Sequence, residues 1–253
     1  MASFWQTLTN RLNPAPVDPP PARAGYEIDM HNHLLPDVDD GIYATDDALT
    51  CLRQFAGWGI RHVVATPHIS QDMFPNTSAH LQAVADKLRL AIEAENLPIT
   101  FHLGAEYMAD ELFAKRLADN DLLSFGTERY VLIETGWASM PLPFSQWLFQ
   151  LQTQGYRPIL AHPERYSYFR GKTAALADLR EQGCLLQLNL MSLTGRYGSE
   201  ARRLAQSLIQ QGLVDLTSSD LHRPDDLPML EKALQTSDYQ LLCQLPLTRP
   251  TFV

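Results

Sequence analysis

Cysteine is scarce in this chain of 253 residues, which has only three, namely Cys51, Cys184 and Cys243. No two of them are close in the sequence, and their number is odd. This pattern argues against a disulfide framework and against a zinc site built from thiolates. Any metal bound by this chain must therefore use nitrogen and oxygen ligands.

The sequence also lacks long apolar runs and nucleotide-binding loops. Its apolar stretches are too short and too interrupted to span a bilayer. The N-terminus carries no apolar core of the signal-peptide type, so we expect a cytoplasmic protein that is not transmembrane. No G-x-G-x-x-G or G-x-x-x-x-G-K-[ST] motif follows a predicted strand, which leaves a dinucleotide or P-loop site without support.

Positive charge is in deficit as well, with 20 lysines and arginines against 29 acidic residues and a formal net charge of -9. An acidic surface is a poor docking face for a phosphate backbone, so we expect no nucleic-acid partner. The same charge suits a basic or mixed-charge protein partner.

Residues 1–24 differ in composition from the rest of the chain. The stretch NPAPVDPPPARAG carries five prolines and predicts an extended linker. The residues before it place four large apolar side chains near helical spacing: Phe4, Trp5, Leu8 and Leu12. We favour a terminal helix packed on its own domain, and the alternative is a docking peptide for a partner or a membrane surface. Residues 25–253 are predicted to form one domain.

Strand-like and helix-like segments alternate through this domain. Short apolar segments predict seven strands, at residues 26–30, 60–68, 98–107, 129–135, 156–164, 184–190 and 213–222. Segments of helical period predict helices at residues 45–59, 77–96, 109–119, 142–155, 172–183, 199–212 and 225–235. This alternation favours an α/β fold of parallel βα units, either closed as a barrel or open as a doubly wound sheet.

Every predicted strand ends in polar residues, and in a βα barrel these ends meet at one rim. Six of the seven ends carry a metal-ligating side chain: His31 and His33, His68, Glu106, Glu134, His162, and Asp220 with His222. The other three histidines fall inside predicted strands or helices, and we expect structural roles for them: His62, His80 and His102. Five of eight histidines at one rim indicate a metal site.

The spacing supports this interpretation. His31 and His33 are two residues apart, so on a strand both rings point to the same face. Asp220 and His222 repeat that spacing on the last strand, which would lie beside the first in a closed barrel. Imidazoles and carboxylates without thiolates suit zinc, manganese or iron. Clusters in which a carboxylate bridges two ions activate water and bind phosphate oxygens.

The motifs H-x-H-x-L-P-x-x-D-D-G, T-P-H, G-x-E, E-T, H-P-E-R-Y and S-D-x-H, in this order, resemble the polymerase-and-histidinol-phosphatase (PHP) superfamily. Over residues 26–225 the chain is most similar to bacterial manganese-dependent protein-tyrosine phosphatases of capsule and exopolysaccharide clusters. The resemblance implies a distorted (β/α)7 TIM-like barrel with three divalent ions, manganese first and iron, zinc, cobalt or magnesium as alternatives. The wider superfamily often has a histidine near Asp39 or Asp40, and its absence here favours the tyrosine-phosphatase branch over the histidinol-phosphatase branch.

The resemblance also implies residue roles. One ion would be held by His31, His33, Glu106 and Asp220; a second, bridged by Glu106, by Glu134 and His162; and a third by Asp40, His68 and His222. Arg165, Asp220 and His222 would be catalytic, and Arg165 would bind the substrate phosphate. Apart from the resemblance, we expect Arg223 to assist in binding the phosphate because it is next to His222 in the sequence. Asp40 is preferred to Asp39, which is expected to cap the loop, and Gly41 is expected to permit the turn.

The implied substrate is the tyrosine-rich C-terminal tail of a bacterial tyrosine autokinase that controls polysaccharide assembly, with recruitment to the membrane-bound kinase as an option. Two alternatives stay open: a phosphatase for a small metabolite such as histidinol phosphate, or another PHP phosphoesterase, and a non-catalytic metal-binding module that tethers the kinase. The segment Cys243–Arg249 formally matches the C-x5-R signature of cysteine-dependent phosphatases. Pro246 removes one N–H there and no glycine permits the tight turn, so we reject that mechanism. The sequence gives no indication of the oligomeric state.

Overall fold

The computed structural model describes residues 23–252, so the expected terminal helix and most of the expected linker lie outside the described residues. All ladders in this part of the chain are parallel, as predicted. One sheet consists of β1 (Ile28–Asp29), β2 (His62–Ala65) and β4 (Thr100–Leu103). The other has the order β3 (His68–Ile69), β5 (Glu106–Met108), β6 (Tyr130–Glu134), β7 (Arg157–Ala161), β8 (Leu185–Asn189) and β9 (Leu216–Ser218).

Two of the seven predicted strands are interrupted, which is why nine strands are seen in the described residues. Pro67 separates β2 from β3, since it has no N–H to give to a ladder. Gly104 separates β4 from β5, where a Cβ atom would lie 2.9 Å from the ring of Phe125. Each break moves the strand from the three-stranded to the six-stranded sheet. His68 and Glu106 therefore begin the second sheet as register partners.

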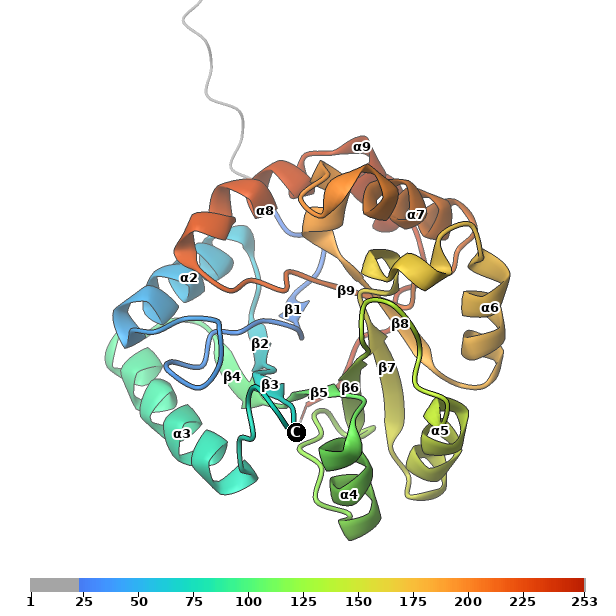
Figure 1. Ribbon diagram of the computed structural model, residues 1–253. Coiled ribbons are helices and arrows are strands. Elements are labelled where there is room, and N and C mark those ends of the chain that lie inside the picture. The colour runs from blue at the N-terminus through green and yellow to red at the C-terminus, as the bar shows by residue number, and fades with distance from the viewer. Residues whose placement is uncertain (1–22, 253) are drawn as a thin grey trace, which may run out of the picture.

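The helices lie around the outside of the strands (Figure 1). All seven predicted helices are present: α2 (Thr45–Trp58), α3 (Ser78–Ala94), α4 (Glu111–Asp119), α5 (Phe144–Thr153), α6 (Thr173–Glu181), α7 (Gly198–Gln210) and α8 (Leu227–Leu234). A further short helix, α9 (Ser237–Leu242), follows α8 and was not predicted. Within the described residues, the helices are all too short or too polar to cross a bilayer.

Parallel strands covered on both faces are expected to be apolar throughout, and the central strand β6 is buried at all five positions. The predicted α/β class and its parallel βα units are therefore confirmed. The expected barrel is seen only in part, because the ladders in the described residues define two sheets rather than one closed ring. The breaks at Pro67 and Gly104 are the physical reason for this division.

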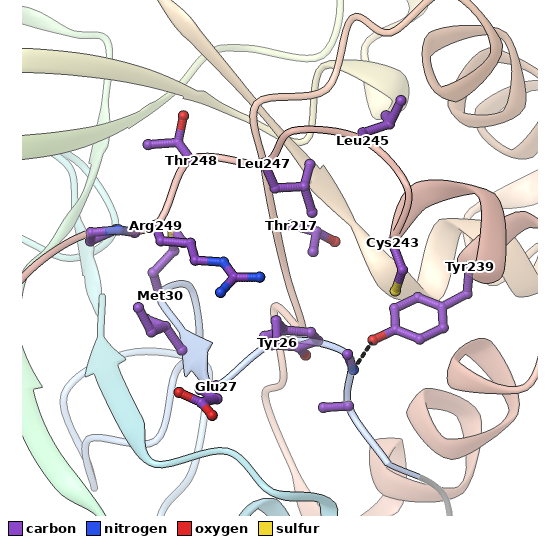
Figure 2. Close-up of a pocket in the computed structure, with 14 residues that line it drawn as sticks. Tyr26, Glu27, Met30, Thr217, Tyr239, Cys243, Leu245, Leu247, Thr248 and Arg249 are labelled. Atoms are coloured by element: carbon purple, nitrogen blue, oxygen red, sulfur yellow. Dashed lines mark hydrogen bonds between the residues drawn. The ribbon is translucent and has the colours of Figure 1, made fainter.

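The two ends of the described chain meet beside a cavity of about 300 Å³ (Figure 2). The backbone N–H of Gly25 donates a hydrogen bond of 2.5 Å to the Tyr239 hydroxyl at this junction. Cys243 and Arg249 both line the cavity, but Cys243 caps the C-terminal end of α9. Carbonyl groups, not N–H groups, point outward from that end of a helix, and they repel a phosphate. The C-x5-R match therefore has the wrong geometry for a phosphate loop.

Candidate metal centre

The structure brings all nine expected metal ligands together at the carboxyl ends of the strands. Their donor atoms form four overlapping groups, and within each group these atoms lie within 4.8 Å of one another. The groups are His33, Asp40, His68 and His222; His31, His33 and Asp220; His31, Glu106 and His162; and His68, Glu106 and Glu134. These groups overlap and therefore do not assign the ligands to single ions: Glu134 lies with Glu106 and His68, and His33 lies both with Asp220 and with Asp40.

Glu106 is the centre of this arrangement. Its Oε2 atom lies 3.2 Å from His31 Nε2, 3.4 Å from His33 Nε2 and 3.2 Å from His68 Nδ1. Its Oε1 atom lies 3.0 Å from His162 Nε2. Burial alone would raise the pKa of Glu106, but the imidazoles of His31 and His68 hold it well below its usual range. An ionised carboxylate with two separately directed oxygens is suited to bridge two cations.

The tautomers of the first two histidines are set by acceptors behind them. His31 Nδ1 lies 2.9 Å from Gln187 Oε1, and His33 Nδ1 lies 2.8 Å from Asp39 Oδ2. Because both partners accept, each Nδ1 donates a hydrogen, and Nε2 is the nitrogen that the neutral ring would offer to a cation. The two Nε2 atoms and Glu106 Oε2 are buried without a hydrogen-bond partner in the described part of the chain. Such atoms fit a cation, and no thiolate is among them.

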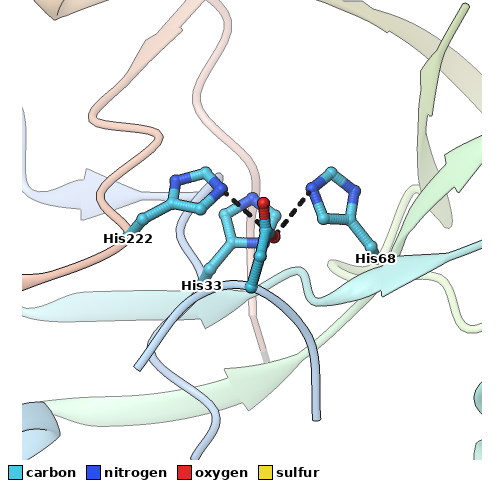
Figure 3. A group of neighbouring side chains, drawn as sticks. His33, His68 and His222 are labelled. Carbon is cyan, nitrogen blue, oxygen red and sulfur yellow. Dashed lines mark ion pairs between the residues drawn. The ribbon is translucent and has the colours of Figure 1, made fainter. Parts of the chain in front are cut away.

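Asp39 and Asp40 have separate contacts. The carboxylate of Asp39 accepts from the backbone N–H groups of His68 and Gly41, each at 2.9 Å, besides its contact with His33. Asp40 is 58 % exposed, and its Oδ1 lies 3.5 Å from His68 Nε2 and 3.7 Å from His222 Nε2. Figure 3 shows the rings of His33, His68 and His222 close together, and a carboxylate oxygen of Asp40 lies within 4.8 Å of a nitrogen of each ring. The carboxylate of Asp39 therefore holds the loop in place through hydrogen bonds, whereas the carboxylate of Asp40 faces His68 and His222.

Gly41 has a role, but for a reason different from the expected one. Its φ angle is not in the left-handed region, so backbone freedom is not what the turn requires. A Cβ atom at this position would lie 2.4 Å from the carbonyl oxygen of His33 and 2.5 Å from its Cβ atom. The absence of a side chain therefore lets the loop close over His33.

The two sides of the centre differ in charge. Burial and the guanidinium of Arg165 lower the pKa of His162 to about 4, so this ring stays neutral. Burial opposes charge on His31 too, yet the carboxylates of Glu106 and Asp220 outweigh it and raise its pKa to about 9. Burial and the neighbouring Glu106 raise the pKa of Glu134. The cluster is thus built from strongly interacting groups, as at sites that bind cations or perform acid–base chemistry.

His162 and Asp220 share an uncommon backbone conformation. Their φ angles are 34° and 51°, both in the left-handed region that non-glycine residues rarely adopt. Residues held in this region cluster at functional sites, where the surrounding structure maintains them. Here the Asp220 carboxylate is fixed by Arg165 Nη1 and by Asn189 Nδ2, each at 2.6 Å.

A cavity of about 230 Å³ opens above the cluster, and both polar and apolar side chains line it. The lining residues include Asp40, His68, Glu106, Glu134, His162, Arg165, Asp220 and His222, together with Ser70, Met73, Phe74, Met108 and Trp137. The guanidinium of Arg165 lies 4.7 Å from the ring centre of Trp137 and 4.2 Å from that of Tyr197. Arg165 is therefore held between two aromatic rings at the mouth of the cluster.

Arg223 is not brought to this cavity. It is exposed and precedes a short 3-10 helix, Pro224–Asp226, and the cavity lining does not include it. Its position next to His222 in the sequence does not make it a neighbour of the cavity, because the backbone at Arg223 is extended and adjacent side chains in extended backbone point to opposite sides.

The remaining polar residues take structural positions. His62 and His102 stack with Phe252, and His102 lies 3.9 Å from it between ring centres, away from the cluster. His80 is exposed in the first turn of α3. Glu164 is buried, accepts from Asn189 N and Ser192 Oγ, and has its pKa raised by burial to about 7. It is neither a surface carboxylate nor a hydrogen-bond partner of Arg165.

Sequence reasoning missed the aromatic residues around Arg165. Trp137 comes three residues after Glu134 and Tyr197 follows β8 by eight residues, so neither belongs to a periodic pattern. The available signal was weak: a tryptophan directly after a strand end, in a loop that would otherwise be polar. Gln187 and Asn189, at the end of β8, contact His31 Nδ1 and the Asp220 carboxylate, and nothing in the local sequence indicates this supporting role.

Comparisons with known proteins agree with this geometry. Residues 27–240 match the family described as capsular polysaccharide synthesis, CpsB/CapC. The tyrosine-protein phosphatase YwqE of Bacillus subtilis is 32% identical over 195 residues, covering 77% of both chains. The tyrosine-protein phosphatase CpsB of Streptococcus pneumoniae is 26% identical over 79% of this chain and 85% of its own.

The fold has a solved counterpart. A chain from the crystal structures of YwqE from Bacillus subtilis and CpsB from Streptococcus pneumoniae, described as metal-dependent tyrosine phosphatases, superposes with a TM-score of 0.73. The two sequences are 29% identical, and the match covers 89% of this chain and 99% of that one.

Proposed function

Because this chain belongs to the CpsB/CapC family of capsular polysaccharide synthesis, we propose that it is a metal-dependent protein-tyrosine phosphatase. One observation carries the proposal: nine ligand-capable side chains converge, and seven of them line one cavity together with an arginine. This arrangement of nitrogen and oxygen donors with an anion-binding side chain suits hydrolysis of a phosphate monoester. The relatives named above supply the phosphotyrosine specificity of the proposal.

We propose three divalent ions, with manganese as the native metal. His31, His33, Glu106 and Asp220 would hold one, Glu106, Glu134 and His162 a second, and Asp40, His68 and His222 a third. The unpartnered buried atoms of His31, His33 and Glu106 support the first of these positions. Ions held there would supply Lewis-acid activation of water and would neutralise the phosphate oxygens.

Arg165 binds the substrate phosphate in this proposal. Its Nη1 atom is engaged by Asp220, which leaves the other guanidinium N–H groups to donate to phosphate oxygens. The planar fork can engage two oxygens at once, which a lysine could not do. Asp220 thus has two functions, since it would ligate an ion and also hold Arg165 in place. His222 would complete the catalytic set by holding the third ion together with Asp40 and His68.

The seven predicted strands would act as one distorted barrel. An isolated parallel bridge joins Asn32 to Leu221, and Asp220 N donates to His31 O at 2.8 Å. Thr66 N donates to Asn32 O at 2.9 Å, so the first strand also contacts the second near its break. The first two contacts join the end of β1 in one sheet to the end of β9 in the other, and the third continues the pairing of β1 with β2. The contacts between β1 and β9 support closure around the metal centre.

The proposed substrate is the tyrosine-rich C-terminal tail of a membrane-associated tyrosine autokinase, dephosphorylated in the cytoplasm. A net charge of -9 supports a basic or mixed-charge protein partner over nucleic acid. Histidinol phosphate and single-stranded DNA are the control substrates that represent the other chemistries open to this fold.

The test is hydrolysis by purified protein in manganese and in chelator. We expect rapid release of phosphate from a phosphotyrosine peptide in manganese, little release from the two controls, and none in chelator. His31→Ala and Asp220→Ala should each abolish hydrolysis and lower the metal content measured by elemental analysis. Full activity of the metal-free variant that combines His31→Ala with Asp220→Ala would overturn the proposal, and so would a preference for histidinol phosphate.

A further inference from the structure

The mouth of the cavity carries apolar side chains that the metal centre does not use. Met73 is 72% exposed and Trp137 is 51% exposed, although both line the cavity. They come from different loops: Met73 follows β3 and Trp137 follows β6. Large apolar surfaces left open beside a polar site indicate a contact that is completed by a ligand.

Trp137 is held in a defined position. Its carbonyl oxygen accepts hydrogen bonds from Ser167 N at 3.3 Å and from Ser167 Oγ at 2.8 Å. Its ring is near-parallel to that of His162, with 6.1 Å between centres, and lies 5.7 Å from Tyr166. Half of the indole is nevertheless exposed, so this fixed ring keeps free area for a further contact.

The same indole contacts Arg165, the proposed phosphate-binding residue, at 4.7 Å. A phosphate bound by Arg165 would therefore carry its ester group past Trp137. A phenyl ester would bury apolar area against the indole, and aromatic pairs gain a further contribution from their ring quadrupoles. An aliphatic ester of the same charge would gain much less from this contact.

We propose that Trp137 is a specificity-determining residue that contacts the phenyl ring of the substrate and selects aryl over alkyl phosphates. This inference rests on the proposed phosphatase function and deepens it. Trp137 has no part in the phosphate or metal chemistry under this proposal. Its contribution is measured as the difference in affinity between an aryl and an alkyl phosphate monoester.

The experiment compares phenyl phosphate with glycerol 2-phosphate on the manganese-loaded enzyme. We expect Trp137→Ala to raise KM for phenyl phosphate about five- to ten-fold, with kcat little changed. Loss of the Trp137 contact with Arg165 affects both esters equally, and Tyr197 and Asp220 still hold the guanidinium, so the kcat/KM for glycerol 2-phosphate should fall by no more than about two-fold. Trp137→Phe should keep most of the aryl preference, because it keeps a ring. Phe149→Ala, which removes an exposed aromatic side chain from α5, is the matched control.

A binding measurement adds a readout that does not depend on turnover. 4-Nitrophenylphosphonate should quench the tryptophan fluorescence of the loaded enzyme, and Trp137→Phe should remove this quenching, whereas methylphosphonate should quench neither protein. Equal losses on both substrates in Trp137→Ala would show that Trp137 only positions Arg165, and would overturn the inference. An unchanged aryl-to-alkyl ratio would overturn it too. If the original loaded enzyme hydrolyses neither ester, the proposed function itself fails.

Discussion

Two adjacent aspartates with the same side chain have different environments in this protein. Asp39 lies behind the histidines, where its carboxylate receives His33 Nδ1 and two backbone N–H groups. Asp40 lies in front of them and is largely exposed. A carboxylate that satisfies buried donors stabilises the fold, whereas an exposed one that faces imidazoles is free to accept a cation.

We predict that exchanging each aspartate for asparagine separates these roles. Asp39→Asn should lower the free energy of unfolding of the metal-free protein by about 1–3 kcal/mol, because one oxygen acceptor is replaced by a donor. Asp40→Asn should leave that free energy within about 0.5 kcal/mol and should lower the manganese content. Thermal unfolding in chelator and elemental analysis measure the two effects. The reverse pattern would make Asp39 the ligand.

At this scale the sequence predicted which residue types meet, since the nine expected ligands do converge. Residue chemistry alone could not distinguish Asp39 from Asp40, because both are aspartates and differ only in the direction of the loop, and the preference for Asp40 came with the resemblance. Arg223 was expected at the substrate and is not at the cavity, because adjacency to His222 says nothing about where the next side chain points. Trp137 belongs to no spacing pattern, and its proximity to Arg165 exists only in three dimensions.

Among the elements, the loop between β1 and α2 is shaped by contact rather than by turn chemistry. It returns over His33 so closely that a methyl group at Gly41 would overlap the histidine backbone. The loop therefore fixes the position of His33 and of both aspartates.

Gly41→Ala should move this loop away from His33. We expect a loss of about 1–3 kcal/mol of stability from the overlap and weaker manganese binding, because His33 and Asp40 shift together. Gly57→Ala is the matched control, since Gly57 lies in α2 and an added Cβ would meet no atom within 4 Å. It should raise stability by about 0.5–1 kcal/mol. Chemical denaturation of both variants checks this, and equal effects would refute the contact argument.

Helix positions were predictable because each helix is long enough for the spacing of its apolar residues to be recognised in the local sequence. The start of α2 shows the limit. Thr45 and Asp46 are residue types that favour the N-cap, yet the N-cap is Ala44, which makes no side-chain hydrogen bond, and Asp46 lies in the first turn. The strand breaks at Pro67 and Gly104 were missed as well, since they depend on which neighbouring strand each half pairs with.

For the molecule as a whole, metal binding should control stability. The centre joins side chains from most of the strands, so these side chains come together only in the folded state. An ion bound there therefore stabilises the folded state relative to the unfolded state. An ion at a hundred times its dissociation constant contributes about 2.7 kcal/mol. For a chain of this size that corresponds to a rise of about 5–10 °C in the melting temperature.

Thermal unfolding in manganese and in chelator measures this rise. Asp220→Ala should lose most of it, because Asp220 groups with both His31 and His33. Phe149→Ala should keep it, since that side chain is distant from the cluster along α5. Identical melting of the original protein in both solutions would mean that no ion binds at the centre.

The contact of the first strand with the last has a consequence for synthesis of the protein. His33 N donates to Leu221 O and Asp220 N donates to His31 O, so the site joins the earliest and latest parts of the domain. A growing chain on the ribosome has no site until residues 220–222 have emerged. Termination of translation before these residues therefore yields inactive fragments. Any measured activity comes from chains that have been translated at least through residue 222.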